Sequence, residues 1–426
     1  MCCNVGFELL YPTLMSGEVK RKITYRLYPS KRQEEAMRLL FDAHRHLYNA
    51  ALEQRIWAYR SQKKSIDLNE QCRELTQLRA EDPLYRSINA QSSQVTLRRL
   101  HLAFQHFFRR VRQNKKAGFP RFRSAARFKG WGYKTHGDGW RLFPGEEMKH
   151  GHLRLSGVGN IKLRGRARSE GIPKTMEIIR DHGRWYASVT IACAPMRKSG
   201  TQEIGFDWGL ESFLTFDEGG VVVNPRFLSQ SQRKISYLQR QKSKKKRGGS
   251  NRKKVVLQLA REYRRSSNRR QNFHHQQSSR LVGRAKLIGT EALNTSNMIR
   301  PSRGTMKSPG TMIKKKKGLN RSILDGAPGA FLQMVQYKAE EAGVDYIEAP
   351  TRKVKPSQTC PECGSRKKKE LSERVHRCPC GCIMSRDQAA AQVCLAYARK
   401  QVGNQPGGEV PPLGGPGNHE TPVRAA

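Results

Sequence analysis

Acidic residues are scarce in this sequence. Its 426 residues contain 35 Asp and Glu against 81 Lys and Arg, so the formal net charge is +46. Few folds hold so large an excess of positive charge without an anionic partner. A run of about 18 apolar residues, the minimum for a membrane-spanning helix, is also missing. These two absences indicate that the partner is nucleic acid rather than lipid.

Cysteines are sparse outside one short segment. Five of the ten cysteines lie between residues 360 and 382, which suits a local metal site better than a disulfide framework. We therefore expect a reducing, cytoplasmic compartment. Residues 1–14 contain Glu8 and lack the basic stretch of a secretory signal, so we expect residues 1–18 to be disordered or extraneous, with Met15 as an alternative start. The Gly/Pro-rich residues 403–426 predict a disordered tail.

Helices with one buried stripe are predicted for residues 31–119. Alternation over residues 19–28 predicts a strand, and a helix is expected to begin near Ser30. Apolar residues then recur at spacings of three and four. The expected buried stripes are Ala36, Leu39, Leu40, Ala43, Leu47, Ala50 and Ala51, followed by Leu97, Leu100, Phe104, Phe107, Phe108 and Val111.

A small antiparallel β unit is predicted for residues 124–195, after the sequence GFPRFR at 118–123 breaks the helical pattern. Its loops place Arg and Lys beside Trp131, Tyr133 and Trp140. Interleaved cations and aromatic rings can bind unpaired bases and phosphates, and aromatic core packing explains the same rings equally well.

A second region begins near residue 204 and carries the most basic stretch of the chain. Residues 233–270 hold sixteen Lys or Arg and one acid, Glu262. Such a stretch either contacts phosphate or stays solvated. The elements expected around it are strands at 204–208, 213–216, 221–223, 286–291 and 344–349, and helices at 327–343 and 388–401.

Three carboxylates of this region stand out because acids are rare. Asp207 lies inside IGFDWG, Glu291 ends KLIGTE, and Asp387 begins a helix. A carboxylate among buried-strand residues is costly unless a cation neutralises it, and three that converge at strand ends would bind hard divalent ions. Two such ions can activate water and stabilise the leaving oxygen in phosphodiester cleavage. Individually, Asp387 is equally explained as a helix cap and Asp207 as a turn residue. Their joint order along the chain is that of an RNase H-like nuclease.

The cysteine cluster predicts one zinc ion. Cys360 and Cys363 form one pair, and Cys378 and Cys380 form the second, with Cys382 as an alternative ligand. Two such knuckles can bring four thiolates onto one tetrahedral zinc. Only one residue separates Cys378 from Cys380, where two are common, so which of Cys378, Cys380 and Cys382 bind the zinc ion stays open.

Four segments in this order, GFDWGLESFLTF, KLIGTEALNTSNM, SQTCPECGS and CPCGCIMSRDQAAA, resemble the TnpB family of transposon-encoded proteins, relatives of the type V CRISPR effectors. GFPRFRS and RGGSNRKK are also similar to that family, so the resemblance covers residues 19 to about 402. It implies an α/β RuvC-like nuclease domain of RNase H fold with a zinc-ribbon insertion. It also implies an N-terminal wedge-type β barrel into which a helical recognition bundle is inserted.

The activity that this resemblance implies is cleavage of double-stranded DNA beside a short adjacent motif, directed by a guide RNA from the transposon end. Asp207, Glu291 and Asp387 would be the catalytic triad and would bind two Mg²⁺ ions. The implied location is the cytoplasm of a prokaryote, associated with the nucleoid. The expected nucleic-acid contacts are Lys244, Lys245, Lys246, Arg247, Arg252, Lys253 and Lys254.

One departure from the family concerns Ser385, which stands where the family often has Asp in Asp-Arg-Asp. The second Asp, Asp387, is retained, so catalysis is expected. Two alternatives stay open, a transposase that joins strands and a guided repressor without nuclease activity. The expected domains are residues 19–30 and 120–198 (wedge-type barrel), 31–119 (helical bundle), 199–356 and 385–402 (nuclease domain) and 357–384 (zinc ribbon).

Overall fold

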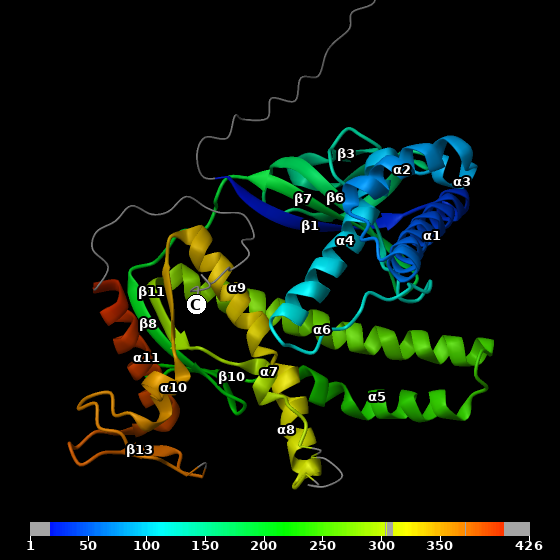
Figure 1. Cartoon of the computed structure of the whole chain (residues 1–426). Coiled ribbons are helices and arrows are strands. Elements are labelled where there is room, and N and C mark those ends of the chain that lie inside the picture. The colour runs from blue at the N-terminus through cyan, green and yellow to red at the C-terminus, as the bar shows by residue number, and fades with distance from the viewer. Residues whose placement is uncertain (1–17, 303, 305–309, 371, 404–426) are drawn as a thin grey trace, which may run out of the picture. The chain divides into compact units, whose positions relative to one another are not determined.

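The computed structural model of the chain describes residues 18–302, 304, 310–370 and 372–403 (Figure 1). The expected disorder of residues 1–18 and 403–426 falls almost wholly outside these ranges. The chain divides into two units, Met1–Ala194 and Pro195–Ala426, and each is described by itself.

A seven-stranded antiparallel sheet forms the frame of the first unit, in the order β2-β6-β7-β1-β5-β4-β3. The N-terminal strand β1 lies at its centre and pairs with both β5 and β7. Among the described residues no hydrogen bonds join the edge strands β2 and β3. The strands of the expected barrel therefore form an open sheet and not a closed one. Its strands are β1 (Val19–Tyr28), β2 (Gly130–Tyr133), β3 (Trp140–Pro144), β4 (Lys149–Leu155), β5 (Gly159–Arg166), β6 (Ile172–Asp181) and β7 (Arg184–Cys193), with a 3-10 turn at Glu146–Met148.

Four helices complete this unit, and the first and the fourth of them pack against strand β2 of the sheet. The first begins where the sequence predicts, because Ser30 and Gln33 form a reciprocal capping box at its start. Its buried face meets Trp131, which is fully buried. The helices are α1 (Lys31–Gln62), α2 (Leu68–Glu81), α3 (Pro83–Arg86) and α4 (Ala90–Arg112).

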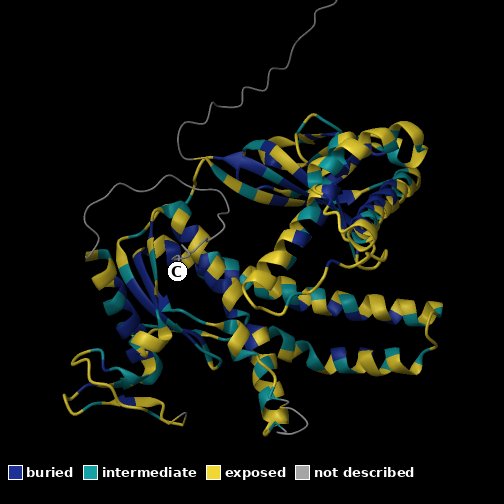
Figure 2. Cartoon of the chain, in the orientation of Figure 1, coloured by how far each residue is buried: buried dark blue, intermediate teal, exposed yellow. Residues whose placement is uncertain are grey.

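The expected helical stripes are partly wrong (Figure 2). Leu39 is 68% exposed and Ala50 is also exposed, because the aromatic rings Phe41 and Tyr48 occupy the buried face of α1 in their place. On α4 the core ends at Phe104, and the apolar residues beyond it face outward. Of the two interpretations left open for Trp131, Tyr133 and Trp140, core packing is correct, since all three are buried.

A five-stranded mixed sheet organises the second unit, in the order β10-β9-β8-β11-β12. The strands β8, β9 and β10 form the predicted antiparallel meander, and β11 runs parallel to both β8 and β12. All five lie within two residues of the predicted bounds. They are β8 (Gln202–Trp208), β9 (Ser212–Phe216), β10 (Val221–Val223), β11 (Ala285–Glu291) and β12 (Asp345–Ala349).

The basic stretch forms a long helical hairpin in this unit, visible as α5 and α6 in Figure 1. A small apolar core of Ile235, Leu238, Val255 and Leu259 joins its two helices. Gly248 supports the connecting turn with a φ of +84°. The helices of the unit are α5 (Phe227–Lys244), α6 (Ser250–Arg284), α7 (Thr295–Met298), α8 (Ile313–Gly326), α9 (Pro328–Ala342), α10 (Thr351–Val354) and α11 (Arg386–Gly403), with a 3-10 turn at Pro356–Gln358. A two-stranded ribbon of β13 (Val375–Arg377) and β14 (Ile383–Ser385) precedes α11.

Candidate active site

Two of the predicted acids lie at the ends of neighbouring strands. The register of the parallel pair β8 and β11 places Thr290 opposite Phe206. Asp207 and Glu291 are the next residue on each strand, so both carboxylates lie at the same edge of the sheet and on the same face of it. That face also carries Gly205 and Gly289, each two residues before its acid.

Helix α11 packs against this face because the two glycines leave room for its backbone. A Cβ atom at Gly205 would lie 2.2 Å from the carbonyl oxygen of Ala391, and one at Gly289 would lie 2.7 Å from the carbonyl oxygen of Cys394. Asp387 precedes Ala391 by four residues and therefore lies on the same face of α11. The close approach of helix and sheet thus brings Asp387 toward Asp207.

Two amides of α11 fix the position of this helix along the sheet. Gln388 and Gln392 both donate their side-chain N–H groups to the carbonyl oxygen of Asp217, at 3.2 and 3.0 Å. The carboxylate of Asp217 in turn accepts the backbone N–H of Gly205 at 2.9 Å. Sequence analysis missed these positioning residues, and the only available signal was the placement of two Gln in the first turns of a helix that follows an acid.

We expect Gly205→Ala to disturb the acid cluster. The added methyl group meets backbone atoms of α11, which cannot rotate away, so the helix has to shift and stability falls by about 1–3 kcal/mol. The rate of the DNA cleavage expected from the sequence should fall by a larger factor than the fraction of folded protein, because Asp387 moves with the helix. Thermal unfolding and the cleavage rate measure the two effects. Gly283→Ala is the matched control, since nothing lies within 4 Å of a Cβ atom there, and its behaving like Gly205→Ala would contradict this account.

The three acids interact electrostatically. Burial raises the pKa of Asp207 well above its ordinary value, the charges of Glu291 and Asp387 raise it further, and Arg386 acts in the opposite direction. Burial also raises the pKa of Glu291, which a hydrogen bond with Thr351 partly offsets. Asp207 is thus a buried carboxylate whose ionised form the two other acids disfavour further, and a bound cation would stabilise that ionised form.

A cavity of about 510 Å³ opens beside Asp207 and Asp387. Arg226, Arg374 and Arg386 also line it. Guanidinium groups bind phosphates well. These arginines could therefore hold the phosphates of a nucleic-acid strand on either side of a phosphate that lies at the acids. The sequence did not single out these three arginines, because they come from distant segments of a very basic chain.

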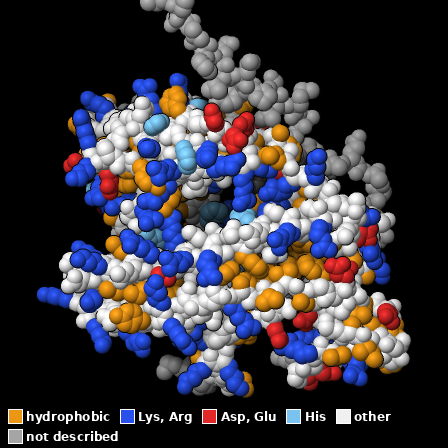
Figure 3. All heavy atoms as spheres, turned by 180° about the vertical axis from the view of Figure 1, so that it is seen from behind, with side chains coloured by type: hydrophobic (Ala, Val, Ile, Leu, Met, Phe, Trp, Pro, Cys, Tyr) orange, Lys and Arg blue, Asp and Glu red, His pale blue; other side chains and the backbone are white. Residues whose placement is uncertain are grey.

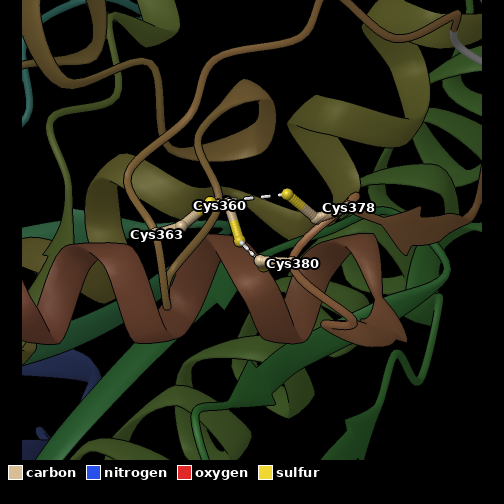
Figure 4. Close-up of side chains that lie close together, drawn as sticks. All are labelled: Cys360, Cys363, Cys378 and Cys380. Atoms are coloured by element: carbon tan, nitrogen blue, oxygen red, sulfur yellow. Dashed lines mark hydrogen bonds between the residues drawn. The ribbon is translucent and has the colours of Figure 1, made fainter.

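The cysteines converge as predicted (Figure 4). The sulfur atoms of Cys360, Cys363, Cys378 and Cys380 all lie within 4.8 Å of one another. The Sγ atoms of Cys360 and Cys380 are 3.7 Å apart, and those of Cys363 and Cys378 are 3.4 Å apart. Hydrogen bonding with Ser365 lowers the pKa of Cys363 to about 6, which favours the thiolate that binds metals.

A second group of possible ligands shares Cys360. It consists of Cys360, His376 and Cys382, all buried, whose ligand atoms also lie within 4.8 Å of one another. Cys382 therefore stays an alternative ligand, and His376 joins it as a possible partner. Both groups need Cys360, so one ion would use one group or the other.

The basic residues predicted to contact nucleic acid surround the tip of the α5–α6 hairpin. Lys244, Lys246, Arg247, Lys253 and Lys254 are exposed there, and Lys245 is partly exposed. Arg252 differs, because it donates to the backbone carbonyl oxygens of Lys242 and Lys245 and so closes the hairpin turn.

Glu262, the one acid of the stretch, is buried and pairs with Lys234 at 2.6 Å. The exposed charges of residues 233–270 are therefore all positive. Figure 3 shows many Lys and Arg and few acids on the visible face of the molecule.

Three family models match this chain. Residues 186–301 match OrfB of IS605, described as "Probable transposase". Residues 329–394 match the "Cas12f1-like, TNB domain", and residues 15–64 match a "Helix-turn-helix domain". The described part of that last segment is a strand and one continuous helix, β1 and α1.

Two bacterial relatives extend the match over most of the chain. The Escherichia coli K12 protein called "Putative RNA-guided DNA endonuclease InsQ" is 27% identical over 362 residues, which are 83% of this chain and 86% of that protein. These matches support assignment of the chain to the TnpB family. A Streptomyces pristinaespiralis member, called "Putative RNA-guided DNA endonuclease", is 29% identical over 394 residues, 90% of each chain.

The fold of this chain is similar to that of a solved Cas12f1 structure. A solved structure titled "Cryo-EM structure of the Cas12f1-sgRNA-target DNA complex" aligns with a TM-score of 0.53 at 11% identity, covering 89% of this chain and 99% of that one. At this identity the similarity concerns the fold alone. None of the helices in the described ranges has the length and apolar character needed to cross a bilayer.

Proposed function

We propose that this chain is a TnpB-type, RNA-guided, magnesium-dependent DNA endonuclease with a RuvC-like site made by Asp207, Glu291 and Asp387. The observation that carries the proposal is the arrangement of Asp207 and Glu291 at the ends of adjacent strands, with the helix that carries Asp387 packed on the same face, beside a cavity lined by arginines. The names of the two relatives support guidance by RNA and cleavage of DNA. Sequencing the RNA that copurifies with the protein tests the guided part directly, and an RNA from the transposon end is expected.

The donor set fits Mg²⁺. Carboxylate oxygens are the ligands that this hard cation prefers. A cation would offset both the burial and the repulsion by Glu291 and Asp387 that raise the pKa of Asp207. The three acids would hold two ions, which supply activation of water and stabilisation of the leaving oxygen when bound. Asp207 and Glu291 come from rigid adjacent strands and Asp387 from a helix packed on them, so the protein fixes the donors before any ion binds.

The cysteines fit one zinc ion. Tetrahedral ligation with Zn–S bonds of about 2.3 Å places sulfur atoms roughly 3.8 Å apart, and the observed separations of 3.4 and 3.7 Å are close to this value. We infer a zinc-ribbon module over residues 357–384 that folds around Cys360, Cys363, Cys378 and Cys380. The module is followed directly by α11, so zinc would also stabilise the segment that leads to Asp387.

The α5–α6 hairpin is proposed to hold part of the guide RNA. We expect the combined change of Lys244, Lys245, Lys246 and Arg247 to Ala to weaken RNA binding and to reduce its dependence on salt, because fewer counterions are released. The fold should survive, since these side chains lie outside the apolar core of the hairpin. Affinity titrations at several salt concentrations measure the effect, and an unchanged salt slope would remove the hairpin from the RNA interface.

A transposase that joins DNA strands is the second candidate, favoured by the description "Probable transposase" of the matched family. The same three acids would serve it. Trapped strand-transfer products would identify this activity. Specific target occupancy without any nicking in Mg²⁺ would instead identify the guided repressor, which would have intact acids but no cleavage.

A further inference from the structure

The first unit contains a cavity that belongs neither to the acids nor to the cysteines. It measures about 760 Å³ and lies among the last turns of α1, the second half of α4 and the loop of residues 113–123. Aromatic rings dominate its wall. They are Tyr59, Phe104, Phe107, Phe108, Phe119 and Phe122.

Most of these rings are not part of the core. Tyr59 is 61% exposed, Phe108 and Phe122 are each 50% exposed, and Phe119 is 47% exposed. The helical stripe of α4 predicted burial for Phe108, and the structure leaves it facing the cavity. A contiguous exposed patch of large rings is typical of a binding surface rather than of a solvated one.

The cavity is preformed. Phe119 contacts Phe104 and Phe107 edge to face, with ring centroids 5.5 and 5.3 Å apart. Farther along the same loop, Arg123 exchanges two hydrogen bonds with the side chain of Asn49 on α1, at 2.8 and 3.1 Å. Contacts on both sides of Phe122 therefore fix the loop against α1 and α4, so little order has to be gained on binding.

One donor atom of a buried cation in the wall lacks a hydrogen-bond partner among the described residues. Arg55 is only 8% exposed, its Nε donates to Gln71 at 2.7 Å, and its guanidinium lies 5.3 Å from the ring centre of Phe104. Its Nη2 atom is buried and has no hydrogen-bond partner among the described residues. A buried donor without an acceptor is costly, and an acceptor atom on a ligand in the cavity would satisfy it.

The charge around the cavity is positive. Arg60, Lys64 and Arg121 line it together with Arg55, and among the described lining residues none is acidic. Lys64 pairs with Glu70, which lies outside the lining set. The cavity thus combines aromatic faces, a buried donor and cations at one place, which matches the base, the polar edge and the phosphate of a nucleotide.

We propose that this cavity binds an unpaired nucleotide of single-stranded RNA. Its base stacks on the phenylalanine rings, an acceptor on its edge meets Arg55, and its phosphate faces Arg60 and Arg121. Sequence-tolerant binding of unpaired bases uses this combination of stacking and charge. The choice of RNA over single-stranded DNA rests on the proposed function, whereas the base and phosphate chemistry rests on the cavity.

The test uses the full-length chain freed of nucleic acid and a short single-stranded RNA, measured by fluorescence anisotropy without target DNA or Mg²⁺. Phe108→Ala and Phe122→Ala should each weaken binding about fivefold or more, with an unchanged salt slope. Phe108→Trp should keep the affinity, because it keeps a stacking surface. Phe143→Ala is the matched control, since that ring is 44% exposed on β3 and outside the cavity, and it should bind as the parent does.

Photo-crosslinking with 5-iodouridine in the same RNA gives a direct readout, and the adduct is expected within residues 104–122. Affinity unchanged by both alanine variants, or adducts confined to other segments, would overturn the proposal. A loss seen only with single-stranded DNA of the same sequence would overturn the assignment to RNA. The binding assay does not depend on cleavage, so it can be interpreted even if the nuclease proposal fails. If Phe108→Ala keeps both the cleavage rate and the RNA affinity of the parent, only the proposal that the cavity binds a nucleotide is rejected.

Discussion

Asp207→Asn is expected to reduce Mg²⁺-dependent DNA cleavage by several orders of magnitude while guided target binding largely survives. The change removes a ligand of the proposed ions and keeps the size of the side chain, and correctly placed ions supply much of the rate in phosphodiester cleavage. Single-turnover cleavage and target binding of the same preparation measure the two effects. Glu291→Gln and Asp387→Asn should behave alike, since all three acids act as one unit.

The same substitution is expected to stabilise the protein in Mg²⁺-free buffer. The pKa of Asp207 is raised in the folded state, so the ionised carboxylate opposes folding, and this penalty is complete above the raised pKa and absent below the ordinary value near ~3.9. Asn carries no charge, so the melting temperature at neutral pH should rise, and the gain should vanish as the pH falls below that window. Adding Mg²⁺ should stabilise the parent more than the variant.

Asp325→Asn is a control, because it removes a different acid from the cavity beside Asp207 and Asp387. Asp325 lines it as well, but its carboxylate accepts the backbone N–H of Leu228 at 3.0 Å at the start of α5. Its loss should lower stability and leave residual cleavage in the folded fraction. Cleavage by Asp207→Asn within tenfold of the parent would contradict the assignment of the acids.

Cys363→Ser is expected to abolish stoichiometric zinc binding and to unfold residues 357–384. Structural zinc contributes about 10–16 kcal/mol of apparent binding free energy, far more than the small ribbon of β13 and β14 supplies by itself. Elemental analysis should find about one zinc per parent chain and almost none in the variant. Limited proteolysis should then cut within this module.

Cys380→Ser and Cys382→Ser separate the two possible ligand groups. The group of four cysteines predicts that Cys380→Ser loses zinc and that Cys382→Ser keeps it. The reverse result would assign the ion to Cys360, His376 and Cys382. Cys394→Ser is a suitable control, because Cys394 is buried in α11 away from both groups.

Several parts of this molecule follow from local sequence alone. The strands at 202–208 and 285–291 match their predicted positions closely, because each contains a short apolar run of the length of a buried strand. The start of α1 follows from the cap at Ser30. The cysteine pairs are close enough in sequence that their spacing alone predicts convergence, as found.

Other features were decided only by tertiary structure. The burial of Phe41 in place of Leu39 depends on which side of α1 meets the sheet, and both residues fit a helical stripe. The proximity of Asp387 to Asp207 depends on Gly205, whose missing side chain matters only because α11 crosses it. Residues about 180 positions apart have no local interaction that could report such a contact.

The cavity of the first unit shows the same limit. A periodic apolar pattern predicts that Phe108 is buried, since periodicity says which residues share a face and not whether that face finds a partner. The core of α4 ends at Phe104, and the loop that carries Phe119 and Phe122 covers the remaining rings only in part. The sequence by itself determined the elements, the net charge, the cysteine cluster and the other chemistry-bearing residues. Packing between distant segments decided which acids meet and which rings stay open to a ligand, because no local interaction reports such contacts.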